Sequence, residues 1–390
     1  MVALLASSTR DIAAAEDAVS DAVESALRTW RSDDFPHNPE GWLLTVARNK
    51  LRDRFRSAAH RTSAPLDELV GSEPVTGDHV PAIIEDRRLE LMFVCAHPAI
   101  DPMIRTPLML QAVLGLDAKE IAAAFAVPAS TMSQRLVRAK RRIRDAGIAF
   151  AIPAPDAMAG RLDAVLEAVY GAFAVDWRGT ADVTQRDSLA GEALHLARTL
   201  AELMPDDPEV LGLNALIAMS AARTPARQRD GILVPVDQQD TARWDEELVE
   251  EGESLLSRAH ALRRRGRFQL EAAVQSVHCD RRRTGVTDWA AIELLYRALL
   301  DLVPTLGAAV SLAVVIGETQ GPTAGLAYLD RIDPHSIARF QPAWAARAHL
   351  LVGAGRLSEA IDAYGRAIDL ATDPAMRGFL EAARASAAGG

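Results

Sequence analysis

The sequence predicts an all-α protein. Of its 390 residues, 49% are hydrophobic but only 5% are aromatic, and Ala, Leu and Arg are abundant, a composition that favours helices over sheets. Apolar residues also recur every three to four positions through most of the chain, which is the spacing of amphipathic helices. The length allows two or three domains with a sizeable core.

Residues 1–61 are predicted to form helices. From Asp11 to Trp30 the apolar positions have helical spacing, at Ile12, Ala15, Val19, Val23, Ala26 and Leu27. Residues 32–39 form a loop, as their Asp, Asn and Pro content indicates. A second helix begins near Pro39. The N-terminal part of this helix is apolar and its C-terminal part is basic, with cations at Arg48, Lys50, Arg52, Arg54, Arg56 and Arg61.

The next stretch, residues 62–82, is rich in Pro, Gly, Ser and acids, and this composition is typical of a flexible linker. Helices are expected again over 83–96 and 103–114. The run Ile152-Pro153-Ala154-Pro155 then indicates a domain boundary.

Residues 115–144 are the most informative part of the chain. Asp117 is placed to cap a short helix, with Glu120 three residues later, and Ile121, Phe125 and Val127 give that helix an apolar face. A break at Pro128 precedes a second helix, which Ser130 and Thr131 can cap. That second helix carries six cations against one anion, Asp145. This order predicts a DNA-binding helix-turn-helix.

From residue 157 onward nearly all of the chain reads as amphipathic helix. A polar loop over 223–242 interrupts it, with a short hairpin expected about Asp230-Gly231. Near the end, tetratricopeptide spacing occurs at Trp344, Ala348, Leu351, Gly355, Ala360, Tyr364 and Ala367. Weaker units cover 288–330 and 186–221. Generic Ala-rich helix pairs are the alternative interpretation.

The charge is unevenly distributed. The net charge is −10, but residues 1–146 carry 19 Lys and Arg against 20 Asp and Glu, whereas the remainder carries 24 against 33. A basic DNA-binding helix is therefore compatible with an acidic chain. The two cysteines indicate no disulfide framework, and we expect a cytoplasmic protein with no signal peptide and no membrane span.

With these segments in order, the chain resembles the extracytoplasmic-function sigma factors of bacterial RNA polymerase, in the subgroup with a tetratricopeptide-like C-terminal extension. The segments AEDAVSDAVESALRTW and GWLLTVARNKLRDRFR resemble sigma region 2, and EIAAAFAVPASTMSQRLVRAKRRIRDAG resembles sigma region 4. LMFVCAHPAI and AELMPDDPEVLGLNAL resemble that subgroup in particular. The implied domains are region 2 over 1–61, the linker over 62–82, region 4 over 83–150 and the extension over 156–390.

The resemblance implies two surfaces on region 2. The helix from Ala14 to Leu27 would dock on core RNA polymerase through Glu16, Asp17, Val19, Asp21 and Val23, although such a set is also typical of a solvated helix face. The following helix would contact the −10 element of promoter DNA through Trp42, Arg48, Asn49, Lys50, Arg52 and Arg56. Aromatic and cationic side chains suit that role because they stack on bases and bind phosphates. For Trp42, packing in the core is the favoured alternative.

In region 4 the implied role is reading the −35 element. The first turns of the second helix, where base edges are met, hold Ser130, Thr131, Ser133 and Gln134. Phosphate contacts are expected from Arg135, Arg138, Lys140 and Arg141.

The chain departs from the sigma-factor pattern at three places. Such factors usually have a further helix before the position of Leu4, and this chain starts inside it, so we expect either a misassigned start codon or an incomplete first helix of region 2. Ser20-Asp21 stands where Gln-Glu is common, and residues 168–180 stray from the subgroup's usual run.

No cofactor, metal or catalytic site is expected. Cys95 and His97 lack the second ligand pair that a zinc site needs, and we interpret them as helix-end packing residues. Asp206, Asp207 and Glu209 suit the start of a helix. The runs 263–265 and 281–283, each three arginines, are interpreted as solvated loop charges, with pairing to acidic faces of the other domains as the alternative.

The sequence thus predicts a non-enzymatic sigma factor whose partners are core RNA polymerase and promoter DNA. The extension is expected to bind a regulatory protein or ligand. The alternative is a helix-turn-helix transcription regulator with a helical-repeat binding domain, for which the docking features of residues 1–61 would have no purpose. A small-molecule enzyme is a more distant alternative because no catalytic constellation is visible.

Overall fold

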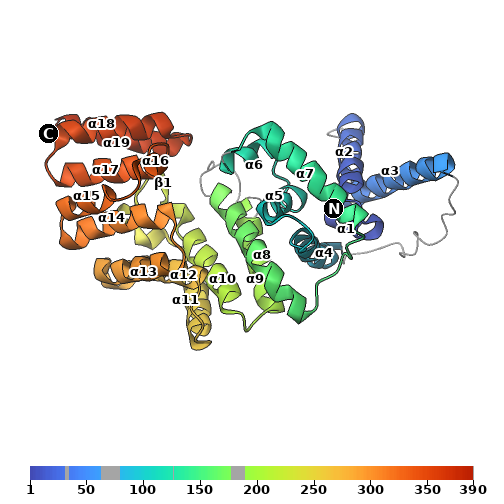
Figure 1. Cartoon of the computed structure of the whole chain (residues 1–390), viewed down its shortest axis with the longest axis horizontal. Coiled ribbons are helices and arrows are strands. Elements are labelled where there is room, and N and C mark those ends of the chain that lie inside the picture. The colour runs from blue at the N-terminus through green and yellow to red at the C-terminus, as the bar shows by residue number, and fades with distance from the viewer. Residues whose placement is uncertain (31–34, 63–79, 126, 177–188, 390) are drawn as a thin grey trace. The chain divides into compact units, whose positions relative to one another are not determined.

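A computed structural model describes residues 1–30, 35–62, 80–125, 127–176 and 189–389 (Figure 1). The prediction of an all-α protein is confirmed, since the described residues form helices joined by short connections and one small hairpin. The chain divides into two compact units, Met1–Val175 and Asp176–Gly390.

The first unit contains eight helices within its described residues. They are α1 (Val2–Thr9), α2 (Ile12–Thr29), α3 (Pro39–Thr62), α4 (Val80–Cys95), α5 (Pro102–Ala112), α6 (Ala118–Ala124), α7 (Ala129–Asp145) and α8 (Pro155–Asp176). The expected linker, residues 62–82, falls mostly on residues 63–79, which lie outside the described part of the chain.

Helix α2 packs along α3, and small residues make the contact. Asp11 caps α2 by accepting a hydrogen bond from the backbone N of Ala14 at 3.0 Å. The buried residues of α2 are Ile12, Ala15, Ala18, Ala22 and Ala26. The expected apolar face is therefore wrong at Val23 and at Leu27, whose side chain is 80% exposed. The alanines lie on a different stripe, which leaves the larger side chains facing outward.

The core of the first unit is built around α4 and α5. Residues 91–96, the start of the LMFVCAHPAI motif, are all buried, and α1 packs on α4 through Ala3, Leu5 and Ala6. Helix α8 joins this core. Arg161 donates to the carbonyl oxygen of Phe93 at 3.2 Å, and a Cβ at Gly171 would lie 3.8 Å from Leu110. The sequence assigned residues 156 onward to the extension, whereas α8 packs with the first unit.

The helix pair α6 and α7 is connected as the sequence indicated, with two differences. Asp117 Oδ1 accepts from the backbone N of Glu120 at 2.7 Å and Glu120 Oε2 accepts from the backbone N of Asp117 at 2.8 Å, which confirms the capping box. The N-cap of α7, however, is Pro128 and has no side-chain cap. Ser130 and Thr131 thus lie in the first turn and do not cap it. Phe125, expected on the apolar face, is 40% exposed.

The second unit is a succession of helices with one hairpin. Its described elements begin with α9 (Leu189–Leu203), α10 (Pro208–Ala221), η1 (Thr224–Ala226), β1 (Gln228–Arg229), β2 (Ile232–Leu233), η2 (Val236–Gln238) and η3 (Thr241–Arg243). They continue with α11 (Glu246–Ala261), α12 (Arg267–Thr284), α13 (Trp289–Leu302), α14 (Leu306–Gln320), α15 (Pro322–Leu329), α16 (Pro334–Ile337), α17 (Gln341–Gly353), α18 (Leu357–Leu370) and α19 (Pro374–Gly389).

Two local predictions in this unit are confirmed. The strands β1 and β2 pair in antiparallel fashion about Asp230 and Gly231, whose positive φ angles of 54° and 75° suit a two-residue hairpin turn. Asp207 caps α10 by accepting from the backbone N of Glu209 at 3.0 Å, so the acidic run does begin a helix.

The helices α14, α15, α17, α18 and α19 stack in chain order (Figure 1). Five of the seven residues with tetratricopeptide spacing are buried between them, namely Ala348, Leu351, Ala360, Tyr364 and Ala367. Close approach depends on small residues, since a Cβ at Gly325 would lie 2.6 Å from the carbonyl oxygen of Ala313.

The described helices include none that is both long enough and apolar enough to span a membrane.

Candidate functional site

Helix α7 has a buried stripe and an exposed basic face. Met132, Leu136, Ala139 and Ile143 are buried, at spacings of three and four residues. The remaining positions turn outward. The exposed residues among those predicted to bind the −35 element are Ser130, Ser133, Gln134, Arg135, Arg138 and Arg141, whereas Thr131 is half-buried. Six of the eight predicted side chains are therefore accessible.

Three arginines of α7 line a shallow hollow beside the start of α5. Arg135, Arg138 and Arg142 form one side of it, and Ile100 and Ile104 contribute apolar lining. Within the described part of the chain, no carboxylate pairs with any of the three arginines; Arg138 Nε donates to the backbone oxygen of Gln134 at 3.3 Å. The hollow is also lined by one carboxylate residue, Asp101, so three guanidinium groups against one carboxylate leave a net positive charge available for an external anion. Arg142 is not among the residues predicted to bind the −35 element.

Lys140 points away from this basic face and pairs with α2. Its Nζ lies 2.5 Å from Oε2 of Glu16, and the two side chains are only 10% and 27% exposed. The second carboxylate oxygen of Glu16 is buried without a hydrogen-bond partner. Burial raises the pKa of Glu16, although the bond from Lys140 opposes this shift. Lys140, which was predicted to bind DNA, is thus paired with Glu16, which was predicted to bind polymerase.

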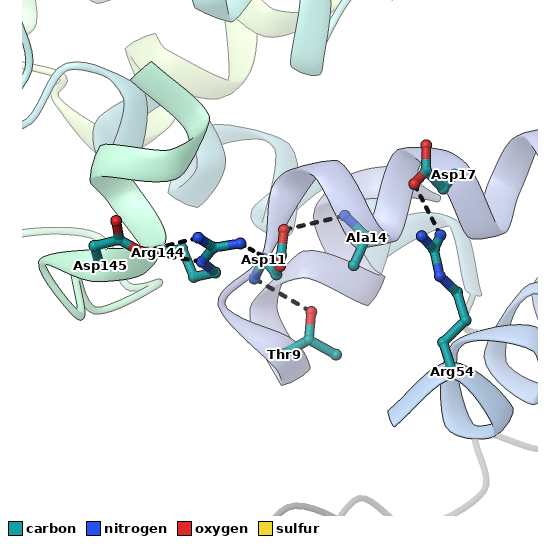
Figure 2. Close-up of polar contacts among 7 residues, drawn as sticks. All are labelled: Thr9, Asp11, Ala14, Asp17, Arg54, Arg144 and Asp145. Carbon is teal, nitrogen blue, oxygen red and sulfur yellow. Dashed lines mark hydrogen bonds and ion pairs between the residues drawn. The ribbon is translucent and has the colours of Figure 1, made fainter. Parts of the chain in front are cut away.

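A second ion pair links the same two helices. Arg144 lies 3.7 Å from Oδ2 of Asp11, the residue that caps α2, and also pairs with Asp145 at 3.0 Å (Figure 2). Neither Asp11 nor Arg144 was among the predicted site residues. Their contact could be recognised only from the packing of α2 against α7, because nothing in the sequence near either residue indicates it.

The other residues predicted to dock on polymerase divide between two faces of α2. Val19 and Val23 lie one and two turns after Glu16 on the same stripe, Val19 half-buried and Val23 exposed. Asp17 and Asp21 lie on another side, where Asp17 Oδ2 accepts from Nη1 of Arg54 in α3 at 2.8 Å (Figure 2). The five residues therefore do not form a single patch.

Helix α3 carries the residues predicted to contact the −10 element. Asn49, Lys50, Arg52 and Arg56 are exposed and Arg48 is half-buried, and within the described residues none of these four cations forms an ion pair.

Trp42, on the same helix, is half-buried in an aromatic cluster. Its ring meets that of Trp30 edge-on at 5.3 Å between centroids, and Trp30 meets Phe35 at 4.8 Å. Trp42 therefore packs against other aromatic side chains, which is the kind of role that the sequence favoured. Trp30 and Phe35 were missed, although two aromatics flanking one loop in a chain so poor in them could have indicated a cluster.

The structure also bears on the remaining candidates. Within the described residues no group of three or more potential ligands is placed to hold a metal ion. Cys95 ends α4 in the core, where burial raises the pKa of its thiol, and His97 Nδ1 accepts from the backbone N of Ala99 at 3.1 Å. Both act as helix-end residues, as expected.

Of the two arginine runs that were interpreted as loop charges, one lies in a helix and the other follows a helix end. Arg281, Arg282 and Arg283 lie in the last turn of α12, where they bind acceptors, so their interpretation as loop charges is wrong. Arg263–Arg265 do follow the end of α11, and Arg264 pairs with Asp207 at 3.3 Å.

Comparison with known proteins identifies two segments. The Sigma-70 region 2 family matches residues 1–61, and a family of unknown function, DUF6596, matches residues 161–260. The chain is 29% identical to the Probable ECF RNA polymerase sigma factor SigI of Mycobacterium tuberculosis, over 36% of this chain and 50% of that protein. It is 30% identical to the Probable RNA polymerase sigma factor RfaY of Xanthomonas campestris, over 35% of each chain. No solved structure matches.

One relative matches along nearly the whole length. The uncharacterized protein R00370 of Rhizobium meliloti is 34% identical over 95% of this chain and 89% of its own. The N-terminal part of the chain is thus homologous to extracytoplasmic-function sigma factors at low identity. The chain belongs to one family with R00370, and its residues 1–61 are a Sigma-70 region 2 domain.

Proposed function

We propose that this chain is a sigma factor that directs core bacterial RNA polymerase to specific promoters. The observation that carries the proposal is the combination, in one compact unit, of a Sigma-70 region 2 domain with an α7 helix that exposes unpaired arginines. A sigma factor is not an enzyme, because the polymerase performs the chemistry. It acts where core polymerase acts, so the proposed location is the cytoplasm.

The proposed roles follow the accessible faces. Helices α6 and α7 form a helix-turn-helix, with Ser130, Ser133 and Gln134 at base edges of the −35 element and Arg135, Arg138 and Arg141 on phosphates. In α3 the exposed Asn49, Lys50, Arg52 and Arg56 contact the −10 element. The cluster of Trp42, Trp30 and Phe35 offers aromatic faces near these cations. Helix α2 docks on the polymerase.

The pair formed by Lys140 and Glu16 gives this proposal a physical consequence. In the free chain the end of α7 packs against the start of α2, so Glu16, one of the residues proposed to dock on polymerase, is occupied by Lys140 of the promoter-reading helix. Docking through Glu16 therefore requires the contact between α2 and α7 to open. Replacing a partly buried ion pair by new contacts on the polymerase can drive that opening.

The second unit, with its stacked helix pairs, is proposed to be a tetratricopeptide-like extension that regulates the first. Stacked antiparallel helices present extended surfaces that suit protein or ligand binding. The proposed extension begins after α8, and not at residue 156, because α8 packs in the first unit.

In vitro transcription with purified core polymerase tests the proposal. We expect the full chain to produce discrete transcripts from a pooled library of bacterial upstream regions, and core polymerase alone to produce none. A matched preparation carrying Gln134→Ala and Arg138→Ala should lose these transcripts but still associate with core. Binding to duplex DNA without any association with core polymerase would instead favour an ordinary helix-turn-helix regulator.

A further inference from the structure

Several arginines near the surface of the second unit are paired with carboxylates. Arg198 binds Glu251 through Nε at 2.8 Å and Nη2 at 2.5 Å, and Arg356 binds Glu359 through the same two nitrogens at 2.7 and 2.6 Å. The two oxygens of one carboxylate therefore match the side edge of one guanidinium, which is the usual bidentate geometry.

Arg223, which follows α10, is buried and has no such partner among the described residues. It is only 7% exposed, yet in the described part of the chain it forms no ion pair. Its Nη2 donates to the amide oxygen of Gln275 in α12, and its Nε is buried with no partner. In Arg198 both Nε and Nη2 bind Glu251. In Arg223 only Nη2 of these two donors is used, and its acceptor is a neutral amide.

Within the described residues, no carboxylate acts directly on Arg223. Glu253 of α11, which acts on the neighbouring Cys279, is itself bound to Arg283. On α12, Gln275, His278 and Cys279 lie on one face, and α13 contributes Tyr296; the charged groups that perturb Arg223 include no carboxylate. Burial and the two nearby guanidinium groups lower the pKa of His278 to about 4, so its imidazole is neutral near pH 7.

A second cation lies nearby and is also held by neutral acceptors. Arg281 donates through Nη2 to the backbone oxygens of Val236 at 2.8 Å and Gln239 at 2.7 Å, and it lies over the ring of Trp244. Glu271, one turn before Gln275 on α12, is bound to Arg267 at 2.7 Å. The nearest acid on that helix is therefore already neutralised.

Burying a cation without an anion is strongly unfavourable, and proteins almost always pair such a group. We propose that Arg223, Gln275 and His278 form a binding site for a small carboxylate. One carboxylate oxygen accepts from Nε and the other from Nη2, and the Gln275 amide rotates to donate its NH₂ to the ligand. Gln275 and His278 are half-exposed, which gives the ligand a route from solvent. The site lies outside the residues that the proposed sigma function uses.

The choice of a carboxylate over a phosphate follows from the number of donors. The site offers one free guanidinium edge and one amide, which suit two coplanar oxygens; a phosphate dianion needs more donors than these. Inorganic phosphate therefore serves as the comparison anion.

Thermal unfolding of the full chain tests the site. In a carboxylate-free buffer at constant ionic strength, acetate or succinate should raise the Tm of the wild-type chain by about 3 °C at roughly ten times its Kd. Chloride and inorganic phosphate should give no comparable rise. Arg223→Met should abolish the response, and Arg198→Met, which removes a surface arginine, should keep it.

A second variant remains informative if Arg223→Met does not fold. Gln275→Glu places a carboxylate within reach of Arg223 and should raise the Tm without ligand while removing the response to acetate and succinate. The proposal is overturned if neither carboxylate raises the wild-type Tm more than chloride does, if phosphate alone does so, or if Gln275→Glu responds like the wild type.

Discussion

Lys140 Nζ lies 2.5 Å from Glu16 Oε2, which joins the helix predicted to read the −35 element to the helix predicted to dock on polymerase. The two residues are 124 positions apart in the sequence. Because both side chains are largely buried, this contact is more than a surface ion pair of the kind that contributes little. If the proposed function holds, binding of polymerase through Glu16 must first open this contact.

Reversing the charge of Lys140 should open the contact between α2 and α7. Lys140→Glu places a second carboxylate against Glu16, whose other oxygen already lacks a partner, at a cost of about 1–3 kcal/mol. Spin labels on Ser20→Cys and Val137→Cys, both exposed positions, report the distance between the two helices. We expect a narrow distribution in the parent chain and a broader, longer one in the variant.

The matched controls use the same two labels. Arg135→Glu makes the same charge reversal on the same helix at an exposed position without a partner, and should leave the distance distribution narrow. Combining Lys140→Glu with Glu16→Lys should restore it. An unchanged distribution in Lys140→Glu would show that the pair does not hold the helices together. The native Cys95 and Cys279 are buried, so labelling should be selective.

Substitutions on the exposed face of α7 should separate affinity from sequence preference. Arg138→Ala removes a phosphate contact, so binding to all duplexes should weaken and the salt slope should fall by about one. Gln134→Ala should instead change the preferred −35 sequence. Titrations over several salt concentrations measure both effects, and Arg356→Ala, in the second unit, is the control. An unchanged salt slope for Arg138→Ala would rule out its phosphate role.

Local features of this fold could be predicted from the sequence, because they depend on neighbours a few residues apart. The capping box of Asp117 and Glu120 and the hairpin at Asp230-Gly231 are set by backbone geometry over four residues. The all-α class followed in the same way from helical periodicity. Periodicity did not reveal which face of α2 is buried, because its alanines pack closely while Leu27 is left exposed.

Long-range contacts could not be predicted. Helical periodicity places Lys140 at the edge of the buried stripe of α7, whereas Arg138 and Arg141 lie away from it, but the sequence does not reveal that α2 packs there and supplies Glu16. Arg144 and Asp11 meet for the same reason. Six of the eight residues assigned to the −35 element are exposed as the sequence implied, but their roles remain predictions.

Truncated chains should show whether α8 is part of the first unit. Helix α8 buries Leu162, Val165, Leu166, Val169 and Phe173. A chain ending at residue 154 exposes the core that α8 covers, whereas one ending at residue 176 retains it. We expect the shorter chain to lose several kcal/mol of stability, since each large apolar side chain contributes about 1.5–3 kcal/mol on burial. Urea unfolding compares the two, and equal midpoints would mean that α8 is not part of the unit.

Stability should fall in acid partly through His278. Burial and the nearby Arg223 and Arg281 hold its folded-state pKa at about 4, below the usual 6.5. The folded chain therefore binds fewer protons than the unfolded chain between these values, so this stability is present above pH 6.5 and is lost as the pH falls towards 4. The loss is on the order of 3 kcal/mol. Urea unfolding at pH 7 and pH 5 should show a smaller difference for His278→Gln than for the wild type. His335→Gln, at an exposed site, should behave as wild type. If His278→Gln keeps the full pH dependence, the imidazole is not held neutral by its surroundings.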